Sequence, residues 1–234
     1  RALRANAALE HWWPVIEESL ERQAFARAEK AFNLPTARQV ALTLQNRTPA
    51  NSSDLMAVAL YALRALQQSL RNSDTNRLNR FWTVDTAGKR PQPPHRPEPE
   101  CRKAIAEWLR ANLAGLDISV AIEHQHGAQN QTDIVLRVRT PAHEDMLLPI
   151  EIKGDWNRDL WTAATEQLAR QYASEPRCHG QGIYLVLWLG SNRGEASKPK
   201  KHPNHPTQIP VDLQTHLQLE ANKKTSGQNI RVFV

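Results

Sequence analysis

The sequence predicts an α/β protein in which a helical segment precedes a domain with a mixed central sheet. Three observations support this: a helical pattern over residues 1–90, five prolines between residues 88 and 99, and an ordered series of helix and strand patterns after them. Prolines lack an amide donor and cannot sustain a helix. We therefore expect a helical segment over 1–90, a Pro-rich linker over 91–97 and a separate domain over 98–234. A surface loop inside one domain is the alternative for the prolines.

The helical segment has two parts. Residues 1–33 are rich in Ala, Leu, Glu and Arg, with Pro14 as a break. A second helix is expected over 54–70, where Ser52 and Ser53 carry the hydroxyl groups that cap helix N-termini. Its apolar residues recur at helical spacing and form one stripe that must pack on another element: Leu55, Ala59, Leu63, Leu66 and Leu70.

After the prolines the expected order is helix, three strands, helix and strand. The elements are a helix over 98–113, strands over about 118–123, 132–139 and 146–153, a helix over 158–173 and a strand over 183–189. The last strand is a continuous apolar run, which is typical of a central strand covered on both faces. In the strand over 146–153, Glu151 and Lys153 share the face opposite to the apolar side chains.

Composition and charge limit the classes of partner. The net charge is +6 and the pI is near 9.6, which favours a polyanion because neutralising phosphates releases counterions. Cys101 and Cys178 are too few for a disulfide framework, so we expect a reducing, cytoplasmic compartment. No apolar run approaches the roughly 20 residues that span a bilayer, so no membrane partner is expected. Because Arg1 begins in a helical pattern and a strand pattern over 230–234 ends the chain, we expect a piece of a longer polypeptide.

Asp133, Glu151 and Lys153 form the pattern that carries chemistry. Two carboxylates on adjacent strands can hold a hard divalent cation, and Mg²⁺ takes only one or two of them besides water. Lys153 lies two residues after Glu151 and projects from the same strand face. Its ammonium can stabilise a metal-activated hydroxide or the charge of a developing phosphorane. The strand is otherwise apolar, so a glutamate and a lysine in it need a reason.

These residues resemble a known superfamily. The dipeptide Thr-Asp at 132–133, the triplet Glu-Ile-Lys at 151–153, a helix with Gln167 and a final apolar strand are similar to the PD-(D/E)XK nucleases. That superfamily includes restriction endonucleases, Holliday junction resolvases and RecB-like exonucleases. The resemblance covers about residues 98–190 and implies a restriction endonuclease-like αβββαβ core. Thr132 stands where the family has Pro.

The resemblance implies a Mg²⁺-dependent nuclease in which Mn²⁺ can substitute. The implied metal ligands are Asp133, Glu151 and the main-chain carbonyl of Ile152. Lys153 then positions or activates the attacking water, and Gln167 matches the helix glutamine of the RecB-like members. Tyr172 departs from their pattern, because it follows Gln167 by five residues rather than four.

Many members of the superfamily add another acid from the first helix or strand. We choose Glu123, which would face Asp133 across the turn over 124–131. Glu100 and Glu107 on the preceding helix are rivals. For each of the three, the alternative is a solvated surface glutamate.

Basic residues after the catalytic pattern are candidates for contacts with a phosphate backbone. They are Arg158, Arg193, Lys198, Lys200 and Lys201. Charge runs are more commonly solvated loops, and that alternative stays open.

Together these features predict a metal-dependent nuclease that hydrolyses phosphodiester bonds, with DNA favoured over RNA on superfamily frequency. A homodimer is expected if both strands of a duplex are cut. The helical leader suggests the effector module of a larger protein, for example one that serves bacterial defence against foreign DNA. Two alternatives belong to other classes: a non-catalytic nucleic-acid-binding module with a nuclease-like fold, and a scaffold domain whose helical part docks a partner.

Overall fold

The computed structural model describes residues 19, 23, 48–72, 78–82, 95–126, 130–139, 145–189, 210–225 and 227–234; for 123–126, 130 and 131 it describes the backbone alone. Contacts divide the chain into two compact units, Arg1–Gln39 and Val40–Val234. The elements below belong to the second unit. The helix expected over 1–33 lies outside the described residues except at positions 19 and 23.

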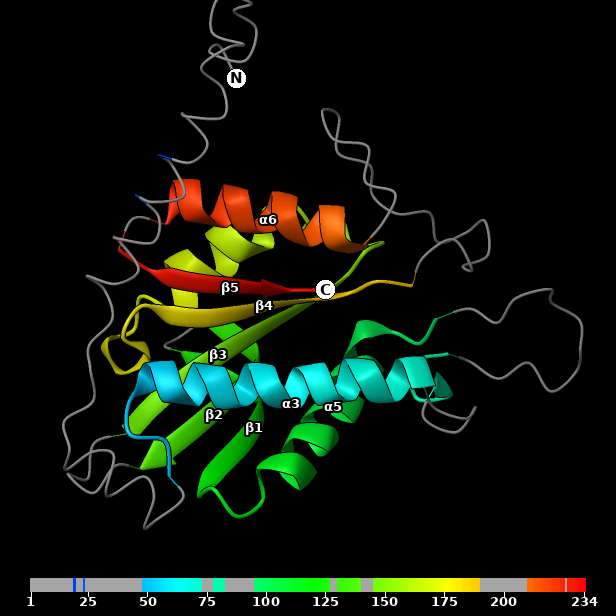
Figure 1. Ribbon diagram of the computed structural model, residues 1–234, viewed down its shortest axis with the longest axis horizontal. Coiled ribbons are helices and arrows are strands. Elements are labelled where there is room, and N and C mark those ends of the chain that lie inside the picture. The colour runs from blue at the N-terminus through cyan, green and yellow to red at the C-terminus, as the bar shows by residue number, and fades with distance from the viewer. Residues whose placement is uncertain are drawn as a thin grey trace, which may run out of the picture. The chain divides into compact units, whose positions relative to one another are not determined.

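A five-stranded mixed sheet forms the centre of this unit, with its strands in chain order. The strands are β1 (Ile118–His126), β2 (Asn130–Arg139), β3 (Asp145–Gly154), β4 (Gln181–Leu187) and β5 (Asn229–Phe233) (Figure 1). The pairs β1–β2 and β2–β3 are antiparallel, whereas β3–β4 and β4–β5 are parallel and need crossover connections. The predicted α/β class with a mixed central sheet is confirmed.

Helices cover both faces of the sheet. The α-helices are α3 (Ser52–Asn72), α5 (Glu98–Leu113) and α6 (Pro210–Lys224); η2 (Ala164–Tyr172) is a π-helix and η3 (Pro176–Cys178) a 3₁₀ turn. Figure 1 shows α3 and α6 on opposite sides of β4 and β5. None of the described helices is long and apolar enough to cross a membrane.

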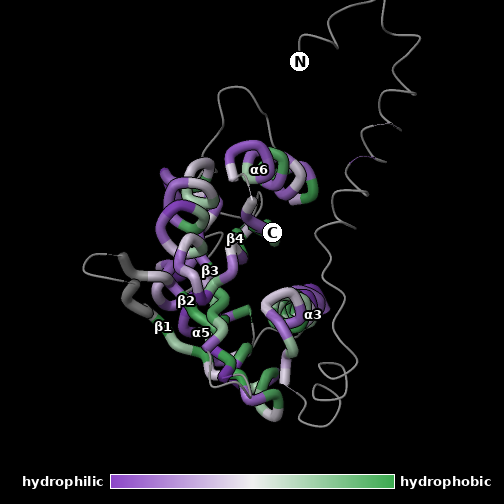
Figure 2. Tube along the Cα trace, turned by 90° about the vertical axis from the view of Figure 1, so that its left-hand side faces the viewer, coloured by the Kyte–Doolittle hydropathy of each residue, from purple (hydrophilic) through white to green (hydrophobic). Residues whose placement is uncertain are grey.

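Side chains on the two faces of the sheet pack into separate hydrophobic cores. On the α3 and α5 side, Leu148, Ile150 and Ile152 of β3 are buried with apolar residues of both helices. On the other side, Tyr184 and Val186 of β4 are buried with η2 and α6. The hydrophobic stretches of β3 and β4 therefore lie between helices (Figure 2). Each fully buried side chain of this size contributes about 1.5–3 kcal/mol of hydrophobic stabilisation.

Helix α3 has the predicted apolar stripe, but its cap differs from the prediction. Asn51 Oδ1 accepts the Asp54 amide at 2.9 Å, so Asn51 is the N-cap. The hydroxyls of Ser52 and Ser53 instead accept hydrogen bonds from Gln181 Nε2, at 3.1 and 3.0 Å. The serine cap was wrong because both serines tie the start of α3 to the start of β4.

Two described points near the Pro-rich region lie side by side in the fold. Trp82 and His95 form an isolated antiparallel bridge, and Arg96 Nε donates to the carbonyls of Asn79 and Trp82 at 2.8 and 3.2 Å. Helix α3 packs on α5, β3 and β4, so it belongs to the same compact unit as the sheet. The division between the two units therefore falls earlier in the chain than the expected linker over 91–97.

Candidate active site

The site forms where two central strands separate. The pairing of β2 with β3 extends as far as Ile134 and Ile150, and Asp133 and Glu151 are the next residues along the two strands. Beyond that point the amide of Ile152 donates to Asp133 Oδ2 at 2.9 Å. A side-chain carboxylate thus satisfies a strand amide at the opening in the sheet.

Glu151 is a buried carboxylate with one unused oxygen. Its residue is 3% exposed, and Lys153 Nζ donates to its Oε1 at 2.5 Å. Its Oε2 is buried and has no hydrogen-bond partner among the described residues. Leaving such an atom unpaired costs free energy unless a ligand or ion satisfies it. The predicted placement of Glu151 and Lys153 on one strand face is confirmed by their contact.

The electrostatic environment sets the protonation of this pair. The pKa of Glu151 is raised from 4.5 to about 7, first by burial and then by the Asp133 carboxylate, while Lys153 offsets part of these two effects. Burial alone would lower the pKa of Lys153, but the charge of Glu151 and the hydrogen bond to it raise that pKa above 10.5. Near neutral pH, therefore, Glu151 titrates while Lys153 remains an ammonium.

Glu98, in the first turn of α5, anchors the chain that follows β3. It accepts the Gly154 amide at 2.6 Å and Asn157 Nδ2 at 2.8 Å, both through Oε1. Its charge also adds to the raised pKa of Glu151, so it belongs to the same electrostatic site. A Cβ on Gly154 would lie 2.4 Å from the Trp156 ring, so this turn accepts only glycine without rearrangement.

Arg102 lies one helical turn after Glu98 and reaches the first carboxylate. Its Nη1 donates to Asp133 Oδ1 at 2.5 Å, and the side chains of the pair are 14% and 17% exposed. Neither Glu98 nor Arg102 was among the predicted site residues. Their spacing of four residues, which puts them on one helix face, was the available signal.

The two rival glutamates of α5 are engaged elsewhere on the surface. Glu100 pairs with Arg96 at 2.7 Å, and Glu107 pairs with Arg80 at 2.6 Å. The acid that this helix contributes to the site is therefore Glu98 rather than either of them.

The backbone of Glu123 lies beside that of Asp133. The pairs Ile122–Ile134 and His124–Thr132 bracket the two residues in the β1–β2 ladder. The side chain of Glu123 lies outside the described part of the chain, so its role as an additional metal ligand stays a prediction.

Helix η2 explains the spacing of Gln167 and Tyr172. Its backbone hydrogen bonds span five residues, as the bond from the Ala173 amide to the Leu168 carbonyl at 2.8 Å shows. Residues five apart therefore lie nearly above one another. Burial, followed by the charges of Glu151 and Asp133, raises the pKa of Tyr172 to about 12. Gln167 Oε1 is buried without a hydrogen-bond partner among the described residues.

The predicted nucleic-acid contacts are only partly described. Arg158 has an 88% exposed side chain and lies 3.5 Å from Asp159, in the turn after β3. The remaining candidates lie outside the described residues: Arg193, Lys198, Lys200 and Lys201. Their role stays a prediction.

The oxygen atoms of the site are suitable ligands for a divalent cation. Within the described ranges, no three His, Cys, Asp or Glu side chains are grouped as a preformed metal cage. Mg²⁺ does not require one, since it is bound through one or two carboxylates and keeps several waters. Asp133, Glu151 with its unused oxygen, and the carbonyl of Ile152 are hard oxygen donors that fit such an ion.

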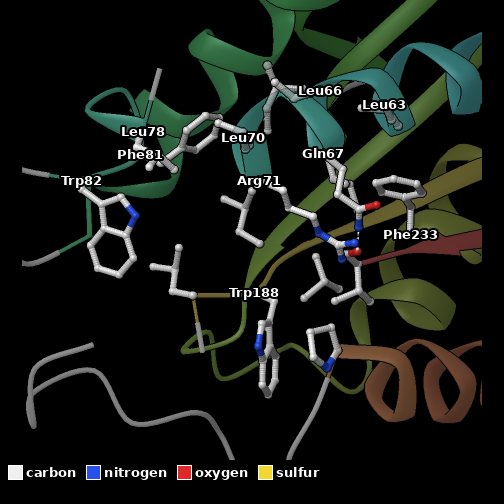
Figure 3. Close-up of a pocket in the computed structure, with 17 residues that line it drawn as sticks. Leu63, Leu66, Gln67, Leu70, Arg71, Leu78, Phe81, Trp82, Trp188 and Phe233 are labelled. Carbon is white, nitrogen blue, oxygen red and sulfur yellow. Dashed lines mark hydrogen bonds between the residues drawn. The ribbon is translucent and has the colours of Figure 1, made fainter. Parts of the chain in front are cut away.

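A separate apolar cavity lies beside α3. It has a volume of about 310 Å³ and lies between α3 and the ends of β4 and β5 (Figure 3). Apolar side chains such as Phe81, Trp82 and Phe233 line it, while Gln67 and Arg71 are its polar residues. The site carboxylates are absent from its lining, so the cavity and the acidic site are distinct.

The fold and the site together define an α/β protein with a buried acidic centre. Comparison of this chain with protein-family models, with curated proteins and with solved structures finds no match.

Proposed function

We propose that this chain is a Mg²⁺-dependent nuclease of the PD-(D/E)XK type, with a restriction endonuclease-like αβββαβ core. The observation that carries the proposal is Glu151, a buried carboxylate whose second oxygen has no partner in the described chain. It lies beside Asp133, where β2 and β3 separate, and Lys153 contacts it from the same strand. A solvated sheet edge does not account for a buried acid, because burying an acid costs free energy.

Each residue has a role that follows from its position. The metal would be held by Asp133, Glu151 and the main-chain carbonyl of Ile152. The N–H and C=O groups of one strand residue point toward the same neighbouring strand. Because the Ile152 amide bonds Asp133 of β2, the Ile152 carbonyl also points toward β2. Mg²⁺, or Mn²⁺ in its place, supplies Lewis acidity and an acidified water when bound. The ammonium of Lys153 stabilises negative charge that develops on the phosphate oxygens. Gln167 offers a buried amide oxygen as a hydrogen-bond acceptor.

DNA is the proposed substrate, on the frequency of DNA-cutting members in the superfamily that the chain resembles. The net charge of +6 supports a polyanionic partner. An effector role within a larger polypeptide, serving defence against foreign DNA, is part of the same proposal, as is a homodimer for cutting both strands.

The direct test is cleavage of plasmid and single-stranded DNA and RNA with Mg²⁺, with Mn²⁺ and with EDTA. We expect native protein to cut only with metal, and Glu151→Gln and Lys153→Ala to lose about 10²-fold or more in rate. Lys103→Ala removes an exposed lysine of α5 and should cut like native protein. Equal cutting by native protein and both site variants would refute the assignment, as would a folded native chain that is inert with every metal and substrate.

A non-catalytic nucleic-acid-binding module is the second candidate. One observation favours it: Asp133 and Glu151 each already have a cationic partner within the chain, at 2.5 Å. Under this alternative the chain binds DNA equally well in EDTA and in Mg²⁺ and never cleaves it. Gel-shift assays run beside the cleavage assay separate the two candidates.

A further inference from the structure

We propose that Arg102 is an internal counter-cation of the metal site: it holds Asp133 in the metal-free chain and transfers to a substrate phosphate when a divalent cation binds. This inference rests on the proposed nuclease function and extends it to the control of metal affinity and substrate positioning. Arg102 is thus a positioning residue rather than a metal ligand.

The contact between Arg102 and Asp133 differs from the surface ion pairs of this chain. Its side chains are 14% and 17% exposed, whereas those of the pair Arg80–Glu107 are 55% and 52% exposed. Solvent screens the exposed pair, so that pair contributes little, while the shielded pair interacts more strongly. A metal ion that binds Asp133 must therefore compete with Arg102 for this carboxylate.

Both oxygens of Asp133 are engaged. Oδ2 accepts the Ile152 amide at 2.9 Å, and Oδ1 accepts Arg102 Nη1 at 2.5 Å. A Mg²⁺–oxygen bond is about 2.0–2.1 Å long, so an ion on Oδ1 and the guanidinium would be two cations on one atom. Repulsion between these two cations favours the departure of Arg102 from Oδ1 when the ion arrives.

The charge balance indicates where the guanidinium goes. The metal-free site contains three acids, Glu98, Asp133 and Glu151, and two cations, Arg102 and Lys153. A dication adds two positive charges and displaces the guanidinium from Asp133. The anion that then enters the site is the substrate phosphate, which a guanidinium binds through two parallel hydrogen bonds. Displacement of Arg102 thus couples metal binding to phosphate binding.

The first measurement is Mn²⁺ affinity without nucleic acid, by titration calorimetry, so that the result does not depend on cleavage. Arg102→Met removes the competing cation, and we expect about tenfold tighter Mn²⁺ binding, the size of one charge-assisted hydrogen bond. Arg102→Lys keeps the charge without the planar fork and should bind between native and Arg102→Met. Arg110→Met is the matched control, because Arg110 lies on the same helix and bonds the Val120 carbonyl instead.

The second measurement is the affinity for a short single-stranded DNA in Ca²⁺. We expect Arg102→Met to bind about tenfold more weakly and Arg102→Lys to recover part of the loss, because a phosphate ligand has been removed. Together with tighter Mn²⁺ binding, this opposite effect is not expected of a residue that only stabilises the fold. Thermal unfolding shows whether each variant is folded; if Arg102→Met is not, Arg102→Lys carries both measurements.

The outcomes separate this inference from the proposed function. If native protein binds Mn²⁺ and cuts DNA, but Arg102→Met and Arg102→Lys bind Mn²⁺ no more tightly, the counter-cation role is overturned while the nuclease assignment stands. If neither native protein nor any Arg102 variant binds Mn²⁺, both are overturned, and the pair with Asp133 is a structural ion pair.

Discussion

Glu151 should make the stability of the metal-free chain depend on pH in an unusual direction. Its pKa is about 7 in the folded chain and 4.5 ordinarily. Between these values the unfolded chain releases a proton that the folded chain keeps, so the free energy of unfolding falls as pH rises. At about 1.36 kcal/mol for each pH unit, the full loss above pH 7 is about 3 kcal/mol. Paired carboxylates with lowered pKa values produce the opposite slope.

Urea unfolding in EDTA, followed from about pH 4.5 to above pH 7, measures this slope. Glu151→Gln is neutral throughout, so the native curve should fall by about 3 kcal/mol relative to the variant curve. Lys153 does not titrate in this window in the native chain, because its pKa is raised above 10.5 and its contribution is lost only at higher pH. Glu151→Gln also removes the charged partner of Lys153, which changes the absolute free energy of unfolding. The comparison is therefore between the slopes of the free energy of unfolding against pH.

A matched substitution tests whether the effect belongs to this site. Glu100→Gln changes an exposed glutamate of the surface pair with Arg96 and should leave the native slope unchanged. If the native and Glu151→Gln curves run parallel from pH 4.5 to 7, Glu151 is ionised in the fold, and the argument from its burial fails.

Three further substitutions test the surroundings of the site. Gly154→Ala should lower the free energy of unfolding by about 1–3 kcal/mol, because its Cβ would lie 2.4 Å from the Trp156 ring. The same substitution in a Trp156→Ala chain should lower it by less. An equal loss in both chains would contradict the clash. Glu98→Ala should lower the free energy of unfolding in urea by about 1–3 kcal/mol, because the Gly154 amide loses its acceptor. Glu98→Gln keeps an acceptor oxygen and should lower it by less. Equal losses for the two variants would contradict this role of Glu98. Gln167→Ala should slow metal-dependent cleavage but change the free energy of unfolding by less than about 0.5 kcal/mol. Gln171→Ala changes an exposed glutamine of the same helix and is the control. Unchanged cleavage by Gln167→Ala would show that Gln167 does not belong to the site.

The sheet could be predicted because its strands carry strong local patterns. Alternation in β2 and β3 separates the two faces, and the continuous apolar run of β4 matches a strand covered on both sides. Helix α6 was missed because its pattern is sparse: only Leu213, Leu217 and Ala221 are buried along its length. Such a narrow stripe becomes a helix face only once β5 and η2 provide a surface to pack on.

The carboxylates of the site could be predicted, but not the residues that surround them. Glu151 and Lys153 are two residues apart on one strand, so strand periodicity alone puts them together. Arg102 meets Asp133 across 31 positions, and Glu98 meets the Gly154 amide across 56. Contacts of that kind depend on how a helix docks on a sheet, and no local pattern in the sequence encodes that docking.

The spacing of Gln167 and Tyr172 shows how an apparent mismatch can arise from the wrong helical repeat. In an α-helix, five residues advance by about 140° beyond a full turn, so the two side chains would point in different directions. The backbone of η2 instead bonds residues five apart, which returns Tyr172 to the face of Gln167. The wider turn of the π-helix accommodates the extra residue. Residues five apart in it have about the same angular offset as residues four apart in an α-helix. Because π-turns are rare and collect at functional sites, the irregular turn itself supports a role for this helix face in the proposed chemistry.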